Sequence, residues 1–327
     1  ACMDGTNDWL PDMAYGRFPA RTAQQLTNMI AKTIAYENST TSQTPFVRNA
    51  AFITSEDNYI ITEGTHNLVV KQYMTPRDYL TWKLYRHTYG ATTAAVINRI
   101  NVGCSLVAYS GHGRAQEWRD PPVSNANVLA LTNEERLPFV MSFACDTGSY
   151  RDYDESFAEA WMRRSAPCGA VAMLASSEDS YWYEDDVFEK AVFAAVFDDQ
   201  ETTAGDIVLR AKKRYLAHYG PGPETLQYFE QYNLFGDPTL RLAVWDAAAV
   251  LSAPAVLPDG SFQFTVSGIS NQSLIVLNST NLMDWVPLTS VVNVSNVIHI
   301  QDPTATNHGS RFYRVVTPST TRSVTTR

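Results

Sequence analysis

A histidine and a cysteine each follow a short apolar run in this sequence of 327 residues. His112 lies between two glycines in the segment SLVAYSGHGRAQEW, and Cys145 ends the run LPFVMSFAC. A thiol becomes a nucleophile when it loses its proton, and an imidazole within hydrogen-bond reach is the usual base. The pair therefore predicts nucleophilic catalysis by Cys145 with His112 as general base and acid. Each residue alone also fits a simpler role, His112 as a polar loop residue and Cys145 as a buried apolar one.

The glycines beside His112 suit the same chemistry. Gly111 and Gly113 lack a side chain, so the backbone can turn sharply there and approach a substrate closely. The backbone N–H of Gly113 and that of Cys145 could then donate hydrogen bonds to an oxyanion. We therefore predict Gly113 and Cys145 as the two oxyanion donors.

Short β-branched runs alternate with helical patterns through most of the chain. Strands are expected at VRNAAFIT, SLVAY, LPFVMSFA and CGAVAML. Such alternation is typical of a mostly parallel sheet that helices cover on both faces. In these sheets the functional loops meet at the carboxyl ends of the strands. Three of the loops begin with SEDN, SGHG and ACDTG, which would bring an acidic group, His112 and Cys145 to one edge.

Two further patterns predict elements at the ends of this sheet domain. Leu26, Met29, Ile30 and Ile34 recur at helical spacing in ARTAQQLTNMIAKTIAYE. Near the other end, the Gly-Asp-Pro of FGDPTL predicts a turn. The strand TLRLAV is then expected to close the sheet.

The composition and the hydrophobic pattern of the sequence change after Leu242. Residues 246–257 are rich in Ala and Pro and are expected to be a linker. Residues 258–318 show period-two alternation between turn residues, which predicts a small β-sandwich. The first domain should therefore span residues 1–245, and residues 319–327 should form a polar tail.

The bulk composition narrows the class of function. A formal net charge of −9 argues against nucleic acid as a partner, because such a partner favours a basic face. No apolar run reaches the roughly 20 residues that a membrane-spanning helix needs. The four cysteines show no spacing typical of a metal site. Because the sequence opens with ACMDGTNDW, we expect a mature or excised part of a longer protein.

Four segments resemble, in the same order, segments of the gingipain-type cysteine peptidases. They are SLVAYSGHGRAQEW, LPFVMSFACDTG, SFAEAWMR with GAVAMLASS, and NLFGDPTL. The resemblance covers about residues 1–245 and implies a caspase-like α/β fold followed by an immunoglobulin-like domain. It implies that Cys145 is the nucleophile, His112 the general base and acid, and Gly113 an oxyanion donor. An acidic residue orients the histidine in this family, and here both chemistry and position allow Glu56 or Asp57.

The resemblance also bears on substrate specificity. Arginine-specific members of the family carry a carboxylate three residues before a histidine, at the base of the primary specificity pocket. Glu63 precedes His66 in this way, and a buried carboxylate there would favour arginine by bidentate pairing. A tryptophan flanks that pocket in the family, and Trp182 matches it in ASSEDSYW. The resemblance thus implies cleavage after Arg, or Lys, while a solvated acid and a packing indole are the simpler readings.

The resemblance implies cofactors, partners and location as well. No cofactor is required for the chemistry, although the family often binds structural calcium. Acidic loops such as Asp152–Glu155 and Glu184–Asp186 offer oxygen ligands, while a solvated loop explains them equally simply. The expected partners are protein or peptide substrates, and an N-terminal subdomain or propeptide that has been removed. The expected location is outside the cell, as a secreted or bacterial surface protein.

Three functions are consistent with these features. The first is hydrolysis of peptide bonds by a cysteine endopeptidase that forms a thioacyl-enzyme. The second is a sortase-like or processing peptidase, or transpeptidase, of exported proteins. The third is an inactive adhesion or anchoring module, which the intact His112 and Cys145 disfavour.

Overall fold

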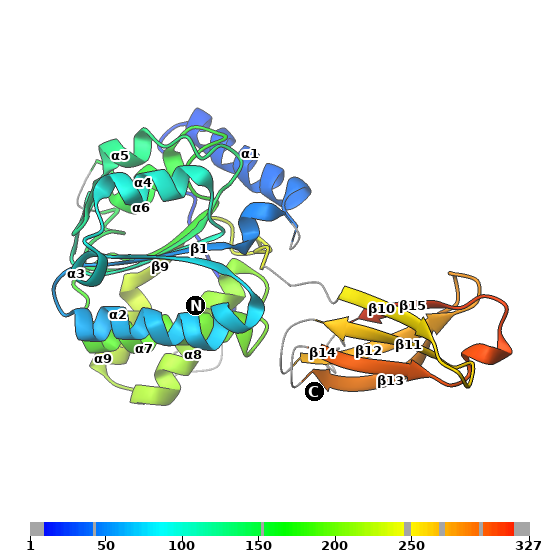
Figure 1. The fold of residues 1–327 in the computed structure, drawn as a ribbon. Coiled ribbons are helices and arrows are strands. Elements are labelled where there is room, and N and C mark those ends of the chain that lie inside the picture. Colours follow the sequence, from blue (N-terminus) through cyan, green and yellow to red (C-terminus); the bar gives the residue numbers. More distant parts are fainter. Residues whose placement is uncertain are drawn as a thin grey trace. The chain divides into compact units, whose positions relative to one another are not determined.

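A computed structural model of the chain describes residues 10–41, 44–151, 154–244, 250–267, 272–293 and 297–316. The chain divides into two compact units, residues 1–75 with 79–245 and residues 76–78 with 246–327. The first unit combines a sheet with helices, and the second is built mainly of β-strands (Figure 1).

A six-stranded sheet forms the centre of the first unit, with the strand order β2-β1-β3-β7-β8-β9. Neighbouring strands run parallel except for β9, which is antiparallel to β8. The strands are β1 (Asn49–Thr54), β2 (Leu80–Tyr85), β3 (Leu106–Ser110), β7 (Phe139–Phe143), β8 (Ala172–Ser176) and β9 (Tyr232–Phe235). The predicted α/β class with a mostly parallel sheet is confirmed.

Helices cover both faces of this sheet (Figure 1). One face carries α2 (Tyr59–Val69), α7 (Trp182–Phe197), α8 (Ala204–Tyr219) and α9 (Pro223–Gln231). The other carries α1 (Ala23–Ser39), α4 (Thr93–Val102), α5 (Asn125–Leu129) and α6 (Phe157–Arg163). Alternate strand residues enter separate cores, Phe52 and Ala108 on the first face and Ile53 and Tyr109 on the second. Both faces of the strands are buried, which explains their continuous apolar sequences.

Helix α1 packs through a different face from its apolar stripe. Met29 is buried, whereas Leu26, Ile30 and Ile34 are exposed by 39%, 41% and 52%. The buried face instead includes Lys32, whose Nζ donates hydrogen bonds to carbonyl oxygens at the C-terminal end of α6. Unpaired carbonyls at a helix end need donors, so the lysine satisfies them and joins the two helices.

The two edges of the sheet differ from expectation. No strand was predicted at the edge strand β2, Leu80–Tyr85. At the other edge, the prediction that TLRLAV closes the sheet is wrong, because the closing strand Tyr232–Phe235 precedes the Gly-Asp-Pro turn. After the turn, Arg241 makes an isolated bridge with Thr203. The backbone of β9 already pairs with β8, which leaves TLRLAV outside the sheet.

The second unit contains two three-stranded antiparallel sheets, β10-β11-β14 and β13-β12-β15. Their strands are β10 (Val250–Val256), β11 (Phe262–Ser267), β12 (Gln272–Ser279), β13 (Val286–Asn293), β14 (Val297–Asp302) and β15 (Phe312–Val316). Side chains from both sheets, such as Phe264 and Val276, share one apolar core, as in a sandwich. Residues 250–256 were expected in the linker and instead form β10, while the predicted tail lies outside the described residues. Assignment of this unit to the immunoglobulin class stays a prediction.

The length and apolar character of the helices were compared with those of a membrane-spanning helix. Among the described residues, no helix combines the length and apolar character that a bilayer crossing requires.

Candidate active site

Three strand exits place the predicted site residues at one edge of the sheet. Strands β3 and β7 are parallel neighbours, with Ser110 paired to Phe143 at their carboxyl ends. His112 and Cys145 each follow that pair by two residues. Strand β1 lies on the other side of β3, so the loop after β1 reaches the same edge. The register of the sheet therefore brings together three segments that are far apart in the sequence.

Gly113 holds the histidine loop against the cysteine loop. A Cβ atom at Gly113 would collide with the carbonyl oxygen of Cys145 and would lie 2.8 Å from Cγ2 of Thr147 and 2.9 Å from Cβ of Ala144. Only a residue without a side chain fits this contact unless the backbone moves. The backbone that follows His112 therefore packs against the Cys145 loop because residue 113 is glycine.

His112 contacts a carboxylate on one side and an indole on the other. Its Nε2 lies 2.8 Å from Oδ2 of Asp57. The ring centroid of Trp182 is 5.0 Å away, at an interplanar angle of 75°. Within the described part of the chain, Nδ1 of His112 has no hydrogen-bond partner. A hydrogen bond from one ring nitrogen to a carboxylate leaves the other nitrogen available as a base.

Glu56 does not share this role. Its side chain is 3.8 Å from Nε of Arg86, and its backbone N–H donates to Oδ2 of Asp120 at 2.8 Å. Of the two acids that the sequence left open, Asp57 is the one in contact with the imidazole.

Cys145 is half-buried and contacts the loop after β8. Its Sγ accepts a hydrogen bond from the N–H of Ser180 at 3.4 Å and lies 3.5 Å from the Ser180 carbonyl oxygen. Burial raises the pKa of the Cys145 thiol, the Ser180 backbone lowers it, and the carboxylates of Asp179 and Asp185 raise it further. The raised pKa keeps the resting sulfur protonated, so attack requires a base.

This raised pKa predicts how Cys145 reacts with iodoacetamide. The alkylation rate should increase with pH through a midpoint above that of an exposed cysteine, because only the thiolate reacts. Replacing the exposed Asp179 with asparagine should lower the midpoint, since a neighbouring negative charge is removed. Stopped-flow alkylation followed by peptide mass spectrometry measures both, with Glu37→Gln on α1 as a control. A midpoint below that of free cysteine would contradict this description.

Glu63 is buried on α2, and its carboxylate is bonded to a neighbouring helix. It accepts hydrogen bonds from the backbone N–H of Thr88 at 3.1 Å and from the Thr88 hydroxyl. Thr88 belongs to the short helix α3 (Arg86–Tyr89), which follows β2. The structure thus brings Trp182 to His112. It shows no contact of the Glu63 side chain with His112 or Cys145. A carboxylate has about four lone-pair sites, so Glu63 retains room for further donors.

Asp185 is a buried carboxylate near Cys145 that the sequence analysis offered only as a calcium ligand. Its Oδ1 accepts hydrogen bonds from the hydroxyls of Tyr232 at 2.6 Å and Tyr228 at 3.0 Å. Its Oδ2 accepts one from the hydroxyl of Ser180 at 2.7 Å. Burial raises the pKa of Asp185 to about 7, although these hydrogen bonds oppose the shift. The sequence contained one clue to this buried acid. Tyr228 and Tyr232 are four residues apart, in the last turn of α9 and at its C-cap, so both hydroxyls can reach the same partner.

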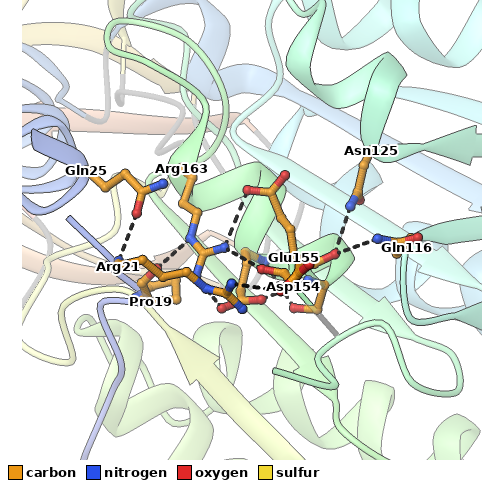
Figure 2. A network of polar contacts seen from close by, with 10 residues as sticks. Pro19, Arg21, Gln25, Gln116, Asn125, Asp154, Glu155 and Arg163 are labelled. Atoms are coloured by element: carbon orange, nitrogen blue, oxygen red, sulfur yellow. Dashed lines mark hydrogen bonds and ion pairs between the residues drawn. The ribbon is translucent and has the colours of Figure 1, made fainter. Parts of the chain in front are cut away.

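The predicted calcium ligands after the cysteine loop are paired with arginines (Figure 2). Nη1 of Arg163 lies 3.5 Å from Oε1 of Glu155, and its Nε donates to the carbonyl of Pro19 at 2.7 Å. Asp154 contacts Nη1 of Arg21 at 3.3 Å. These contacts join the N-terminal segment to the chain that follows Cys145.

The second group of predicted calcium ligands, Glu184–Asp186, was expected in a loop but lies in the first turns of α7. Asp186 forms an ion pair with Lys190 at 2.6 Å and accepts a hydrogen bond from Thr65. Asp152 lies outside the described residues. In the part of the chain that the structure describes, no three His, Cys, Asp or Glu side chains are grouped as metal ligands. Calcium binding stays a prediction.

A family comparison identifies what this chain is related to. The sequence profile described as peptidase family C25 matches residues 1–243. The chain belongs to peptidase family C25. The C25 match covers the whole sheet and all the predicted site residues, so the predicted gingipain-type resemblance is confirmed.

Two groups of curated relatives are similar to this C25 chain. Gingipain R2 of Porphyromonas gingivalis is 26% identical over 285 residues, which cover 83% of this chain and 38% of the relative. Lys-gingipain HG66 of Porphyromonas gingivalis is 25% identical over 345 residues, which cover 98% of this chain and 20% of the relative. The chain therefore spans about two fifths or less of the relatives' length.

Solved structures support the fold of the C25 chain. The crystal structure of the Arg-specific cysteine proteinase gingipain R matches with a TM-score of 0.68 at 23% identity, covering 95% of this chain and 74% of that one. A complex of the pro- and mature domains of the Porphyromonas gingivalis protein RgpB matches with a TM-score of 0.66 at 22% identity. The match covers 95% of this chain and 75% of that one. At these identities the likeness concerns the fold alone.

Proposed function

We propose that this chain is a cysteine endopeptidase that cleaves peptide bonds through Cys145 and His112. One observation carries the proposal. The imidazole of His112 is held by Asp57 at 2.8 Å, in a loop that Gly113 packs directly against the backbone of Cys145. A nucleophile, a base and an orienting carboxylate on three strand exits are the parts of a catalytic triad.

The reaction begins with a neutral thiol. As the sulfur attacks the substrate carbonyl carbon, His112 takes the thiol proton, and Asp57 stabilises the imidazolium that forms. The tetrahedral intermediate collapses when His112 returns the proton to the leaving amine, which gives a thioacyl-enzyme. Water, deprotonated by His112, then hydrolyses the thioester and restores the thiol.

Two backbone N–H groups are available for the oxyanion. Among the described residues, no group accepts a hydrogen bond from the N–H of Cys145. Gly113 pairs with Trp118 in the antiparallel ladder of β4 (Gly113–Arg114) and β5 (Glu117–Arg119). The N–H of Arg119 donates to the carbonyl of His112. Antiparallel hydrogen bonds skip alternate pairs, so the N–H of Gly113 points away from β5. Both donors can therefore serve the intermediate, as in an oxyanion hole.

P1 is the substrate residue before the cleaved bond. A basic P1 side chain would be complementary in charge to the buried acidic side chains of the helices on the face of the sheet that carries α2 and α7. We propose Glu63 as the residue that selects it, with Trp182 stacking on the guanidinium plane. Asp185 is the competing carboxylate, because it shares Ser180 with Cys145. An arginine side chain would favour the ionised form of Asp185, whose pKa burial raises to about 7.

A panel of fluorogenic peptides that differ only in P1 tests the specificity. The wild type should cleave after Arg or Lys at least about 100-fold faster than after Leu, measured as kcat/KM. Glu63→Gln should remove most of this preference by weakening the charged pair, whereas Glu178→Gln, an exposed acid in the loop after β8, should not. Loss of the preference in Asp185→Asn alone would assign the pocket to Asp185. Equal cleavage after Arg, Lys and Leu, unchanged in Glu63→Gln, would overturn the assignment.

The remaining family properties are part of the proposal. Protein substrates outside the cell, structural calcium and a separate pro-domain would fit a peptidase of this family. The pro-domain complex that matches by fold concerns the gingipain, and for this chain a corresponding partner is proposed on that basis.

A further inference from the structure

Exposed aromatic side chains lie at the start of α2 and in α3, the helices that follow β1 and β2. The rings of Tyr59 and His87 are stacked, with centroids 3.5 Å apart and an interplanar angle of 6°. Tyr59 is exposed by 39%, and its neighbour Ile60 by 76%. Tyr89 on the same short helix as His87 is exposed by 61%. We name these four residues, Tyr59, Ile60, His87 and Tyr89, the aromatic shelf.

The shelf is continuous with the catalytic loops. Tyr59 follows Asp57 by two residues, and Asp57 contacts His112. Arg86, which precedes His87, lies 3.2 Å from Oδ1 of Asp120 in the loop after β3. These contacts attach both parts of the shelf to the carboxyl edge of the sheet.

The chemistry of the dyad decides which half of a substrate meets the shelf. His112 must protonate the leaving amine, so the amine half of the substrate lies on the His112 side of Cys145. In the strand order β2-β1-β3-β7, that side leads from β7 through β3 toward β1 and β2. The backbone of the acyl half then lies toward β8, where Trp182 and Asp185 begin α7. Its P1 side chain would turn from there onto the face of the sheet that carries both α7 and α2, where Glu63 lies. This step rests on the proposed function.

The spacing indicates which substrate positions reach the shelf. Neighbouring strands are about 4.8 Å apart, so the exits of β1 and β2 lie roughly 10–14 Å from that of β7. An extended peptide advances about 3.4 Å per residue. A substrate that crosses the strand ends would therefore bring its third or fourth residue after the cleaved bond (P3′ or P4′) over the aromatic shelf.

We propose that the aromatic shelf is a primed-side subsite that selects aromatic or large apolar residues at P3′ and P4′. The stacked pair of Tyr59 and His87 offers a flat ring face on a rigid support, which suits edge-on or offset packing of another ring. Ile60 and Tyr89 add apolar area that is otherwise in contact with water. Acidic residues at these positions would meet Glu56 and Asp57 and should be disfavoured.

The test uses internally quenched peptides that share one sequence through P2′ and carry Phe, Leu, Gly or Asp at P3′ and P4′. A short substrate with a coumarin amide directly after P1 has no primed residues. Each rate is divided by that on the short substrate, so differences in the amount of active enzyme cancel. The wild type should cleave the Phe peptide with a kcat/KM about tenfold above that of the Gly peptide. In Tyr59→Ala and His87→Ala this ratio should fall to within about twofold of unity.

A matched pair of isoleucines provides the control. Ile60→Ser should reduce the Phe to Gly ratio, whereas Ile34→Ser, on the exposed face of α1, should leave it unchanged. Cleavage of all peptides with equal Phe and Gly rates, or a preference that survives in both Tyr59→Ala and His87→Ala, would overturn the subsite while the proposed function stands. Failure to cleave the short and the long substrates alike would overturn the proposed function and the subsite with it.

Discussion

Replacing Cys145 with alanine is expected to lower kcat/KM for peptide hydrolysis by at least about 10⁴-fold. The thiol forms the covalent intermediate, and no other group described at this edge of the sheet can replace it. The side chain is small and half-buried, so the thermal unfolding temperature should change little. Initial rates with the best fluorogenic peptide and a calorimetric scan measure the two quantities.

Two other cysteines control for that substitution. Cys104 and Cys168 are buried in the first unit and are free thiols. Cys104→Ala and Cys168→Ala should retain activity within a few-fold, although the cavities could lower stability. Equal loss of activity in all three variants would contradict a specific role for Cys145.

Replacing Asp57 with asparagine is expected to lower kcat by about 10²–10⁴-fold with the fold intact. An amide can no longer stabilise the imidazolium of His112, and it can favour the wrong ring tautomer. Glu56→Gln is the matched control, because Glu56 lies one residue away and does not contact the imidazole. It should remain within about threefold of the wild type.

The two variants are compared by measuring kcat as a function of pH with saturating substrate. Asp57→Asn should lower the plateau of the profile, because the imidazolium that forms during the reaction loses its carboxylate partner. A larger effect from Glu56→Gln than from Asp57→Asn would contradict the assignment.

The meeting of the strand exits could be predicted from the sequence. SLVAY and LPFVMSFA are apolar throughout, as expected of parallel strands buried on both faces of a covered sheet. The polar residues that follow such strands must then lie at one edge. His112 and Cys145 were predicted to lie together on this rule, and the parallel pairing of β3 with β7 that the rule requires is present.

The choice between Glu56 and Asp57 could not be predicted in the same way. Both are exposed and adjacent, and the loop conformation decides which one faces the histidine. Asn58 adopts a left-handed conformation, with φ of 49° and ψ of 31°, at the start of α2. Short polar side chains tolerate this conformation, but nothing in the sequence fixes where in the loop it occurs.

Residues far from the nucleophile in sequence escaped prediction for another reason. Asp185 receives its partners from Tyr228 and Tyr232, more than 40 residues later in the chain. The edge strand β2 has a weak pattern, because Leu80 is exposed by 44% and its neighbours are half-buried. Both features depend on tertiary packing rather than on a local pattern.

The most direct test of a Cys145 nucleophile paired with His112 is active-site labelling with an arginyl chloromethyl ketone, read by peptide mass spectrometry. The reagent places its electrophilic carbon where the cleaved carbonyl would bind, so it reports binding and nucleophilic attack together. One adduct is expected, on Cys145, at a rate that falls by at least about 100-fold in His112→Ala and to zero in Cys145→Ala. Labelling of another residue, or labelling that survives in Cys145→Ala, would contradict the assignment of Cys145 as the nucleophile.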